Sequence, residues 1–183
     1  LHVAWAALGS YVFARRSGFR AEAGVILGIG FACTPKLLAH LGLGHFGLIS
    51  AVSWTPWLLI YVKSAVHSIQ AGVRSPAIKA GAILGVIFLA DPRWSIPSLI
   101  LALLLGLYLW IRLQQPGRGT PLQIGKVLLL SAGAAIGVGA LLAFPLVELL
   151  PLSTRAGLSA AARDSLALDW AHLLGFVHPI LGQ

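Results

Sequence analysis

The chain has 183 residues, of which 58% are apolar types and only 10% are charged, and its formal net charge is +8. Soluble domains usually carry about 25% charged residues, because most of their exterior faces water. The composition excludes an ordinary soluble enzyme and a disordered chain, and a single cysteine excludes a disulfide scaffold. We therefore expect an all-α integral membrane protein.

Six apolar stretches predict a polytopic bundle of about six transmembrane helices, since a helix needs about 20 residues to cross a bilayer. In chain order they are Leu1–Ala14, Ala21–Thr34, Phe46–Val66, Ala77–Ala90, Ile96–Leu113 and Ile124–Leu150. The second stretch is short, and we expect it to extend through Pro35 toward Leu43. In the last stretch, the spacing of Gly133 and Gly137 predicts close packing against another helix.

The junctions between these stretches alternate between basic-rich and basic-poor. Because Lys and Arg accumulate in cytoplasmic loops, the alternation predicts which junctions are cytoplasmic. They are the junction with Arg15, Arg16 and Arg20, the Lys63–Lys79 loop and the Arg112–Lys126 loop. We expect a multi-pass protein of a bacterial plasma membrane, with membrane lipids as partners and no nucleic acid.

The two ends of the sequence suggest a piece of a longer protein. There is no methionine, and Leu1 begins inside an apolar run. We interpret residues 1–150 as a transmembrane helical bundle that lacks its N-terminal part. Residues 151–183 are more polar and predict the start of an extracytoplasmic loop, with a short interfacial helix that Asp169 would cap.

The junction between the second and third stretches contains Lys36, His40 and His45 among a proline and two glycines. Polar groups at membrane depth are costly, which makes them candidates for function. One interpretation is a cationic pocket for a lipid phosphate or a sugar; the other is a re-entrant turn with interfacial histidines. Two histidines five residues apart are a poor metal site. We predict no metal or cofactor here, although residues outside this sequence could hold a divalent metal.

Two further outer junctions carry carboxylates beside arginines. Asp91 and Arg93 predict a tight capped turn with an ion pair, or a carboxylate that faces a substrate cavity. Glu148 lies among leucines near Arg155, which predicts either a structural ion pair or a polar cleft where Arg155 holds phosphate. These residues complete the candidate binding set: Lys36, His40, His45, Asp91, Arg93, Glu148 and Arg155.

The order and spacing of several segments resemble the bacterial YfhO-like membrane proteins of the GT-C glycosyltransferase superfamily. The resemblance covers most of the chain. Its segments are Ala39–His45, Ser53–Trp57 (similar to a Trp-x-Pro-Trp helix), Leu89–Trp94, Phe144–Arg155 and His178–Gly182. Asp91 departs from the pattern, because many members have a Gly-His-Pro turn there.

The resemblance implies a glycosyltransferase that takes a sugar from a polyprenyl-phosphate carrier and attaches it to an acceptor on the outer membrane face. In that superfamily the catalytic Asp or Glu usually lies in the first outer loop. That loop would precede Leu1, so no catalytic residue is assigned in this sequence. Two other functions stay open, a polytopic transporter or flippase and a noncatalytic membrane scaffold.

Overall fold

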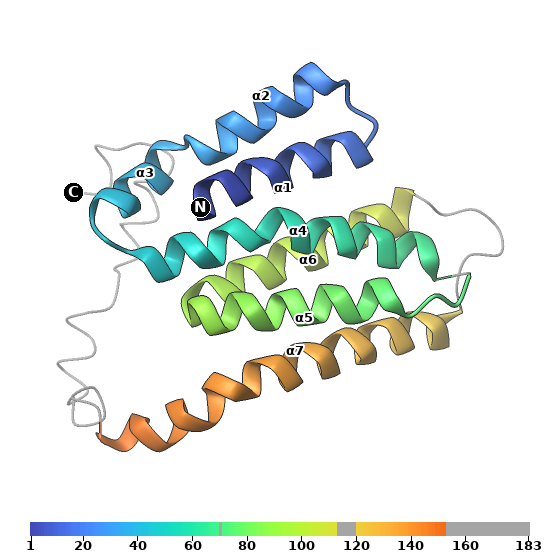
Figure 1. Cartoon of the computed structure of the whole chain (residues 1–183). Helices are drawn as coiled ribbons and strands as arrows, with labels where there is room; N and C mark the ends of the chain where they lie inside the picture. The colour runs from blue at the N-terminus through green and yellow to red at the C-terminus, as the bar shows by residue number, and fades with distance from the viewer. Residues whose placement is uncertain (70, 113–119, 153–183) are drawn as a thin grey trace, which may run out of the picture. The chain divides into compact units, whose positions relative to one another are not determined.

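The computed structural model describes residues 1–69, 71–112 and 120–152, and these residues are helical apart from short connections. The helices are α1 (His2–Arg16), α2 (Ala21–Ala32), α3 (Pro35–Gly42), α4 (Phe46–Ser68), α5 (Ser75–Ala90), α6 (Pro92–Arg112), α7 (Pro121–Leu149) and the 3-10 helix η1 (Leu150–Leu152) (Figure 1). The prediction of an all-α fold is confirmed for this part of the chain. The short C-terminal helix expected near Asp169 lies outside the described residues.

The chain forms two compact units, Leu1–Leu142 and Ala143–Gln183. The first unit contains α1 to α6 and most of α7. The described part of the second unit contains the end of α7 and η1. The contacts described below all belong to the first unit, and the second unit is considered only for Glu148.

Among the described residues, four stretches are long and apolar enough to cross a membrane, and they are compatible with a multi-pass membrane protein. They are Ala21–Gly42, Phe46–Ser68, Pro92–Arg112 and Pro121–Leu152. The remaining helices, α1 and α5, have 15 and 16 residues. At 1.5 Å per residue each is about 23 Å long, shorter than the hydrocarbon core of a bilayer. Six helical stretches therefore occur as predicted, but only four meet the length of a span.

Prolines set two of the helix boundaries. Thr34 precedes Pro35 and has an extended backbone, with φ −58° and ψ 134°, because the proline ring disfavours the helical conformation before it. The second apolar stretch is therefore divided into α2 and α3. Helix α6 begins at Pro92, four residues before the predicted Ile96, because proline suits the first turn of a helix.

The core of the first unit lies between α4, α5 and α6. It contains Leu58 of α4, Ile83 and Ile87 of α5, and Ala102 of α6, and the half-buried Trp54, Trp57 and Trp94 pack against it. Helix α1 contacts α4 at Gly9, whose missing side chain allows the Trp57 ring of α4 to approach closely. Small residues thus replace large side chains where helices meet.

The outward faces of α2, α6 and α7 are apolar. Ile26 of α2, Leu104 of α6 and Leu129 of α7 are 72%, 58% and 73% exposed. In water such large apolar surfaces would be unfavourable, whereas acyl chains solvate them well. This distribution fits a protein whose helices face lipid.

Successive helices of the first unit run in alternating directions, so their junctions gather at two opposite ends (Figure 1). One end, here called the histidine end, contains His40, His45, Asp91 and Arg93. The other, here called the basic end, contains Arg15, Arg16, Arg20, Arg74 and Lys126. At the basic end the Lys63 ammonium donates hydrogen bonds to the Arg16 carbonyl at 2.7 Å and the Ser17 hydroxyl at 3.2 Å.

Candidate functional site

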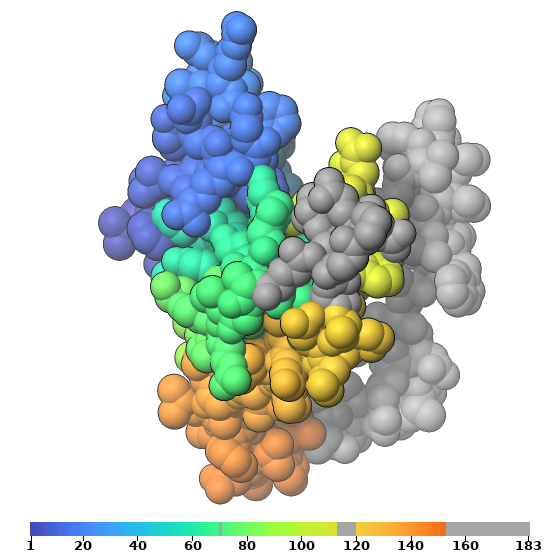
Figure 2. Space-filling model, turned by 90° about the vertical axis from the view of Figure 1, so that its right-hand side faces the viewer, coloured from blue at the N-terminus to red at the C-terminus, as the bar shows by residue number. Residues whose placement is uncertain are grey.

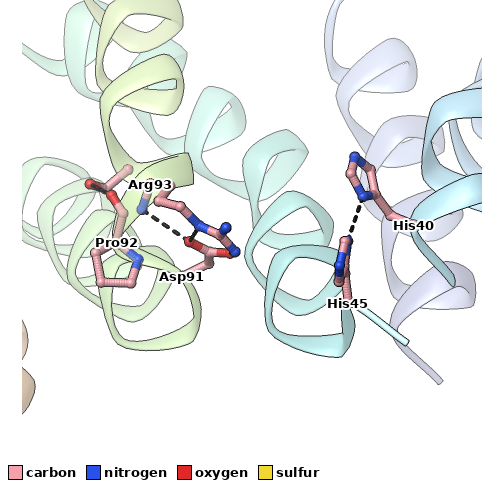
Figure 3. Close-up of polar contacts among 6 residues, drawn as sticks. His40, His45, Asp91, Pro92 and Arg93 are labelled. Carbon is pink, nitrogen blue, oxygen red and sulfur yellow. Dashed lines mark hydrogen bonds and ion pairs between the residues drawn. The ribbon is translucent and has the colours of Figure 1, made fainter. Parts of the chain in front are cut away.

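The first part of the candidate site is a pair of histidines at the turn between α3 and α4. Their Nδ1 atoms lie 2.9 Å apart, and their ring centroids are separated by 5.1 Å (Figure 3). The backbone N–H of His45 also donates to the carbonyl of His40 at 2.9 Å. Gly44 has a φ of +74°, a conformation that favours glycine, and it reverses the chain between the two rings.

This contact constrains the protonation of the pair. One Nδ1 must donate and the other must accept, so at least one imidazole is neutral while the hydrogen bond exists. The Nε2 atoms do not take part in it. Lys36 lies one helical turn before His40 in α3 and is exposed. The turn therefore offers one ammonium and two imidazoles near the surface, which are groups that can donate hydrogen bonds to an anion.

The second part is the capped turn between α5 and α6. One carboxylate oxygen of Asp91 accepts hydrogen bonds from the backbone N–H and the Nε of Arg93, both at 3.0 Å. The other accepts from an Arg93 terminal nitrogen at 2.7 Å, which completes a two-point ion pair. The Asp91 side chain is 6% exposed and that of Arg93 is 81% exposed. This is the capped turn with an Asp–Arg pair that the sequence predicts.

These hydrogen bonds change the acidity of Asp91. The side-chain hydrogen bond from Arg93 lowers the pKa of Asp91 below its ordinary value. Burial opposes this effect, while the backbone N–H of Arg93 and the charges of Arg93 and His45 act with it. The carboxylate is therefore well stabilised in its ionised form and is a weak base.

The two parts of the site belong to the same end of the first unit. A Cβ atom placed on Gly47, two residues after His45, would lie 2.9 Å from the carbonyl oxygen of Ala90, which precedes Asp91. The start of α4 therefore lies against the end of α5. Figure 3 shows the histidine pair and the Asp91–Arg93 pair on these neighbouring segments. The electrostatic effect of His45 on Asp91 agrees with this proximity.

A short chain of polar groups, which the sequence did not indicate, supports the Asp91 turn from inside the core. The indole N–H of Trp94 donates to the Thr55 hydroxyl at 2.9 Å, and that hydroxyl lies 3.4 Å from the hydroxyl of Ser98. Thr55 and Ser98 are buried. Buried polar groups are usually paired, so these contacts fix the first turn of α6 against α4. No local spacing reveals this chain, because Thr55 lies 39 residues before Trp94 and 43 before Ser98.

The two remaining predicted site residues, Glu148 and Arg155, belong to the second unit. Glu148 is exposed near the end of α7 in the second unit, and Arg155 lies outside the described residues. The pairing expected between them therefore stays a prediction. Within residues 1–69, 71–112 and 120–152, no three His, Cys, Asp or Glu side chains gather to hold a metal ion.

Comparisons of the chain with protein-family models, with curated proteins and with solved structures give no match.

Proposed function

We propose that the chain is part of a multi-pass membrane glycosyltransferase of the GT-C type that uses a polyprenyl-phosphate-linked sugar. The histidine end would receive the phosphate of the carrier. The observation that carries the proposal is the gathering of Lys36, His40, His45 and the Asp91–Arg93 pair at one end of a lipid-facing helical unit. The motif resemblance to the YfhO-like proteins supports the same class.

The groups at this end divide into two roles in the proposal. Lys36 and the histidine pair donate hydrogen bonds to the carrier phosphate, as cationic and N–H groups commonly do. Asp91 orients Arg93 and stays ionised, because its lowered pKa makes it a poor acceptor of a proton from a sugar hydroxyl. None of the described carboxylates is assigned a catalytic role in the proposal.

A polar path through the bilayer would favour the transporter alternative instead. The large cavity in the first unit is lined almost entirely by apolar side chains such as Leu58, Leu84 and Leu103. Transported ions and polar solutes need charged groups or backbone carbonyls at their binding sites. The cavity therefore favours the transferase over a transporter of polar solutes.

The test is binding of a polyprenyl monophosphate to the purified protein in a neutral detergent, followed by tryptophan fluorescence or calorimetry. We expect His40→Ala and Lys36→Ala each to weaken binding at least tenfold, because one hydrogen bond to a charged group contributes about 1.5 kcal/mol or more. Arg16→Ala, an exposed cation at the basic end, is the matched control and should bind normally.

Sugar transfer is then measured with a panel of polyprenyl-phosphate sugars and the same variants. The proposal predicts transfer by the wild-type protein and a loss in His40→Ala and Lys36→Ala that parallels their loss of binding. Unaltered binding in both variants would overturn the assignment of the histidine end. Binding by neither wild type nor variants would favour the noncatalytic scaffold.

A further inference from the structure

The first unit contains an apolar groove between α4, α5, α6 and α7. Its volume is about 610 Å³, within the range of about 300–1,000 Å³ that is usual for ligand pockets. Val62, Leu84, Leu103 and Ile136 contribute from the four helices. Gly106 of α6 lines it without a side chain, and a Cβ added there would meet only Val62, at 3.8 Å.

The groove contains little that a polar ligand could use. The hydroxyl of Ser131 is its clearest polar group, and it already donates to the carbonyl of Ala77 at 3.0 Å. A hydrocarbon chain would fill such a space without leaving an unpaired polar group.

A smaller and more polar pocket adjoins the groove at the basic end. Its volume is about 160 Å³, and Ile69 and Val127 line both spaces. The pocket is lined by two basic residues, Arg74 and Lys126, and by the polar residues Gln123 and Ser68. Figure 2 looks onto this end, where the green connection between α4 and α5 lies against the gold start of α7.

The two cations of this pocket carry uncompensated charge. In the part of the chain that the structure describes, neither Arg74 nor Lys126 forms an ion pair with an acidic side chain, and both are exposed. By contrast, Arg93 at the opposite end is paired with Asp91. The pocket therefore presents positive charge to an anion and opens into an apolar groove.

We infer that the groove and the adjoining pocket bind one anionic phospholipid. Its phosphate would lie between Arg74 and Lys126, with Gln123 and Ser68 as further hydrogen-bond donors, and an acyl chain would occupy the groove. Basic pockets between transmembrane helices on the cytoplasmic side bind anionic headgroups in this way. The site lies at the end of the unit opposite the histidine pair, and it does not depend on the proposed glycosyltransferase activity.

The test counts lipids bound to the whole protein by native mass spectrometry. The purified protein in neutral detergent is titrated with phosphatidylglycerol or phosphatidylcholine that carry the same acyl chains. We expect one phosphatidylglycerol to be retained with at least a tenfold preference. Arg74→Gln combined with Lys126→Gln should abolish a tenfold preference, since each basic residue near an anionic headgroup contributes about fivefold and the two factors multiply to about 25-fold.

A matched pair on the groove wall tests the acyl chain. Ala132 lines the groove, whereas a Cβ added to Gly133 would meet no described atom within 4 Å. We therefore expect Ala132→Leu to reduce retention of both lipids and Gly133→Leu to leave it unchanged.

The control for charge is Arg16→Gln combined with Arg20→Gln, which removes two exposed cations from the same end but not from the pocket. It should keep the wild-type preference. If the Arg74 and Lys126 double variant does not fold, the two single variants replace it. The inference is overturned if the wild-type protein shows no preference, if the control loses as much as the pocket variant, or if inorganic phosphate displaces the lipid.

Discussion

The indole N–H of Trp57 donates a hydrogen bond to the backbone carbonyl of Trp5, 52 residues earlier, at 3.3 Å. The two rings also stack, with their centroids 4.4 Å apart and their planes 21° from parallel. Stacked aromatic pairs contribute about 0.5–1.5 kcal/mol beyond their burial. This pair therefore anchors α1 to α4 and sets how close the two helices lie.

The approach of α1 and α4 at this pair depends on a glycine. A Cβ atom on Gly9 would lie 2.6 Å from the Trp57 indole nitrogen, so Gly9→Ala must displace the ring. We expect a loss of about 1–3 kcal/mol in the free energy of unfolding, the usual cost of overpacking. Thermal unfolding in detergent with tryptophan fluorescence measures it. Gly30→Ala in α2 is the control. A Cβ atom at Gly30 would meet no described atom within 4 Å. The free energy of unfolding should therefore rise slightly, because alanine favours the helix more than glycine does.

Replacement of Asp91 should destabilise the turn between α5 and α6. Asp91→Asn removes a charged acceptor that is buried and accepts both backbone and side-chain bonds from Arg93. We expect a loss of about 1–3 kcal/mol at neutral pH, measured by thermal unfolding in detergent. Glu22→Gln, at an exposed carboxylate in the first turn of α2, is the comparison and should cost less.

The effect of Asp91 should also depend on pH. Its pKa in the folded protein lies below the unfolded value of about 3.9. The carboxylate therefore contributes its full stability above the unfolded pKa, and the contribution is lost as the pH falls through the folded pKa. We expect the stability difference between wild type and Asp91→Asn to shrink when the pH is lowered from 6 to 3. A difference that stays constant over this range would contradict the assignment.

The Trp94–Thr55 hydrogen bond should show energetic coupling in a double-mutant cycle. Trp94→Phe and Thr55→Val each remove one partner of the 2.9 Å bond and should each cost about 1 kcal/mol. The double variant should cost less than the two losses added together, because the bond is lost only once. Trp110→Phe, at an indole that is 41% exposed, is the control. Additive losses would mean that the bond does not contribute.

The orientation of the first unit can be tested with cysteine labelling, because Cys33 is the single cysteine of the chain. In a Cys33→Ala background, Leu43→Cys places a thiol at the turn of the histidine end and Arg16→Cys places one at the basic end. Leu43 is 70% exposed, and Arg16 is exposed as well. We expect a membrane-impermeant maleimide to label the first in intact bacterial cells and the second only after permeabilisation. The reverse pattern would invert the predicted topology.

The helices could be predicted because apolar runs and prolines are local signals. The Phe46 start of α4 and the Ala90 end of α5 agree with the predicted stretches, since Gly44 and Asp91 with Pro92 interrupt the helices nearby. Helix α6 begins at Pro92 and not at the predicted Ile96, because the continuous apolar run begins at Ile96 whereas the helix already begins at the proline after the Asp91 cap.

The glycine contacts show what the sequence could not predict. Cβ atoms on Gly133 and Gly137 would meet no described atom within 4 Å, so the expectation that this pair packs against a helix is wrong for the described residues. Gly81 and Gly85 of α5 have the same spacing, and Cβ atoms there would overlap the Ser131 carbonyl and the Val138 side chain. The two glycine pairs have the same spacing in the sequence. Which pair faces a neighbouring helix depends on how each helix is rotated about its axis.

Only part of the candidate site could be predicted from the sequence. The sequence places His40 and His45 in one junction, but their contact requires the positive φ of Gly44. The ion pair of Asp91 with Arg93 could be predicted, because the two residues lie two positions apart in the same turn. The approach of His45 to Asp91 depends on the packing of α4 against α5, and Thr55 joins the same region only through Trp94.

The contact of α7 with Gly81 and Gly85 has an evolutionary consequence. Because α7 meets α5 there through backbone atoms and small groups, most lipid-facing positions of α7 are free to drift among apolar residues without moving the helix. Positions 81 and 85 lack that freedom. In a distant homologue that keeps the groove, these two glycines should persist after most other identities have been lost, and they are the signature by which such a homologue can be recognised.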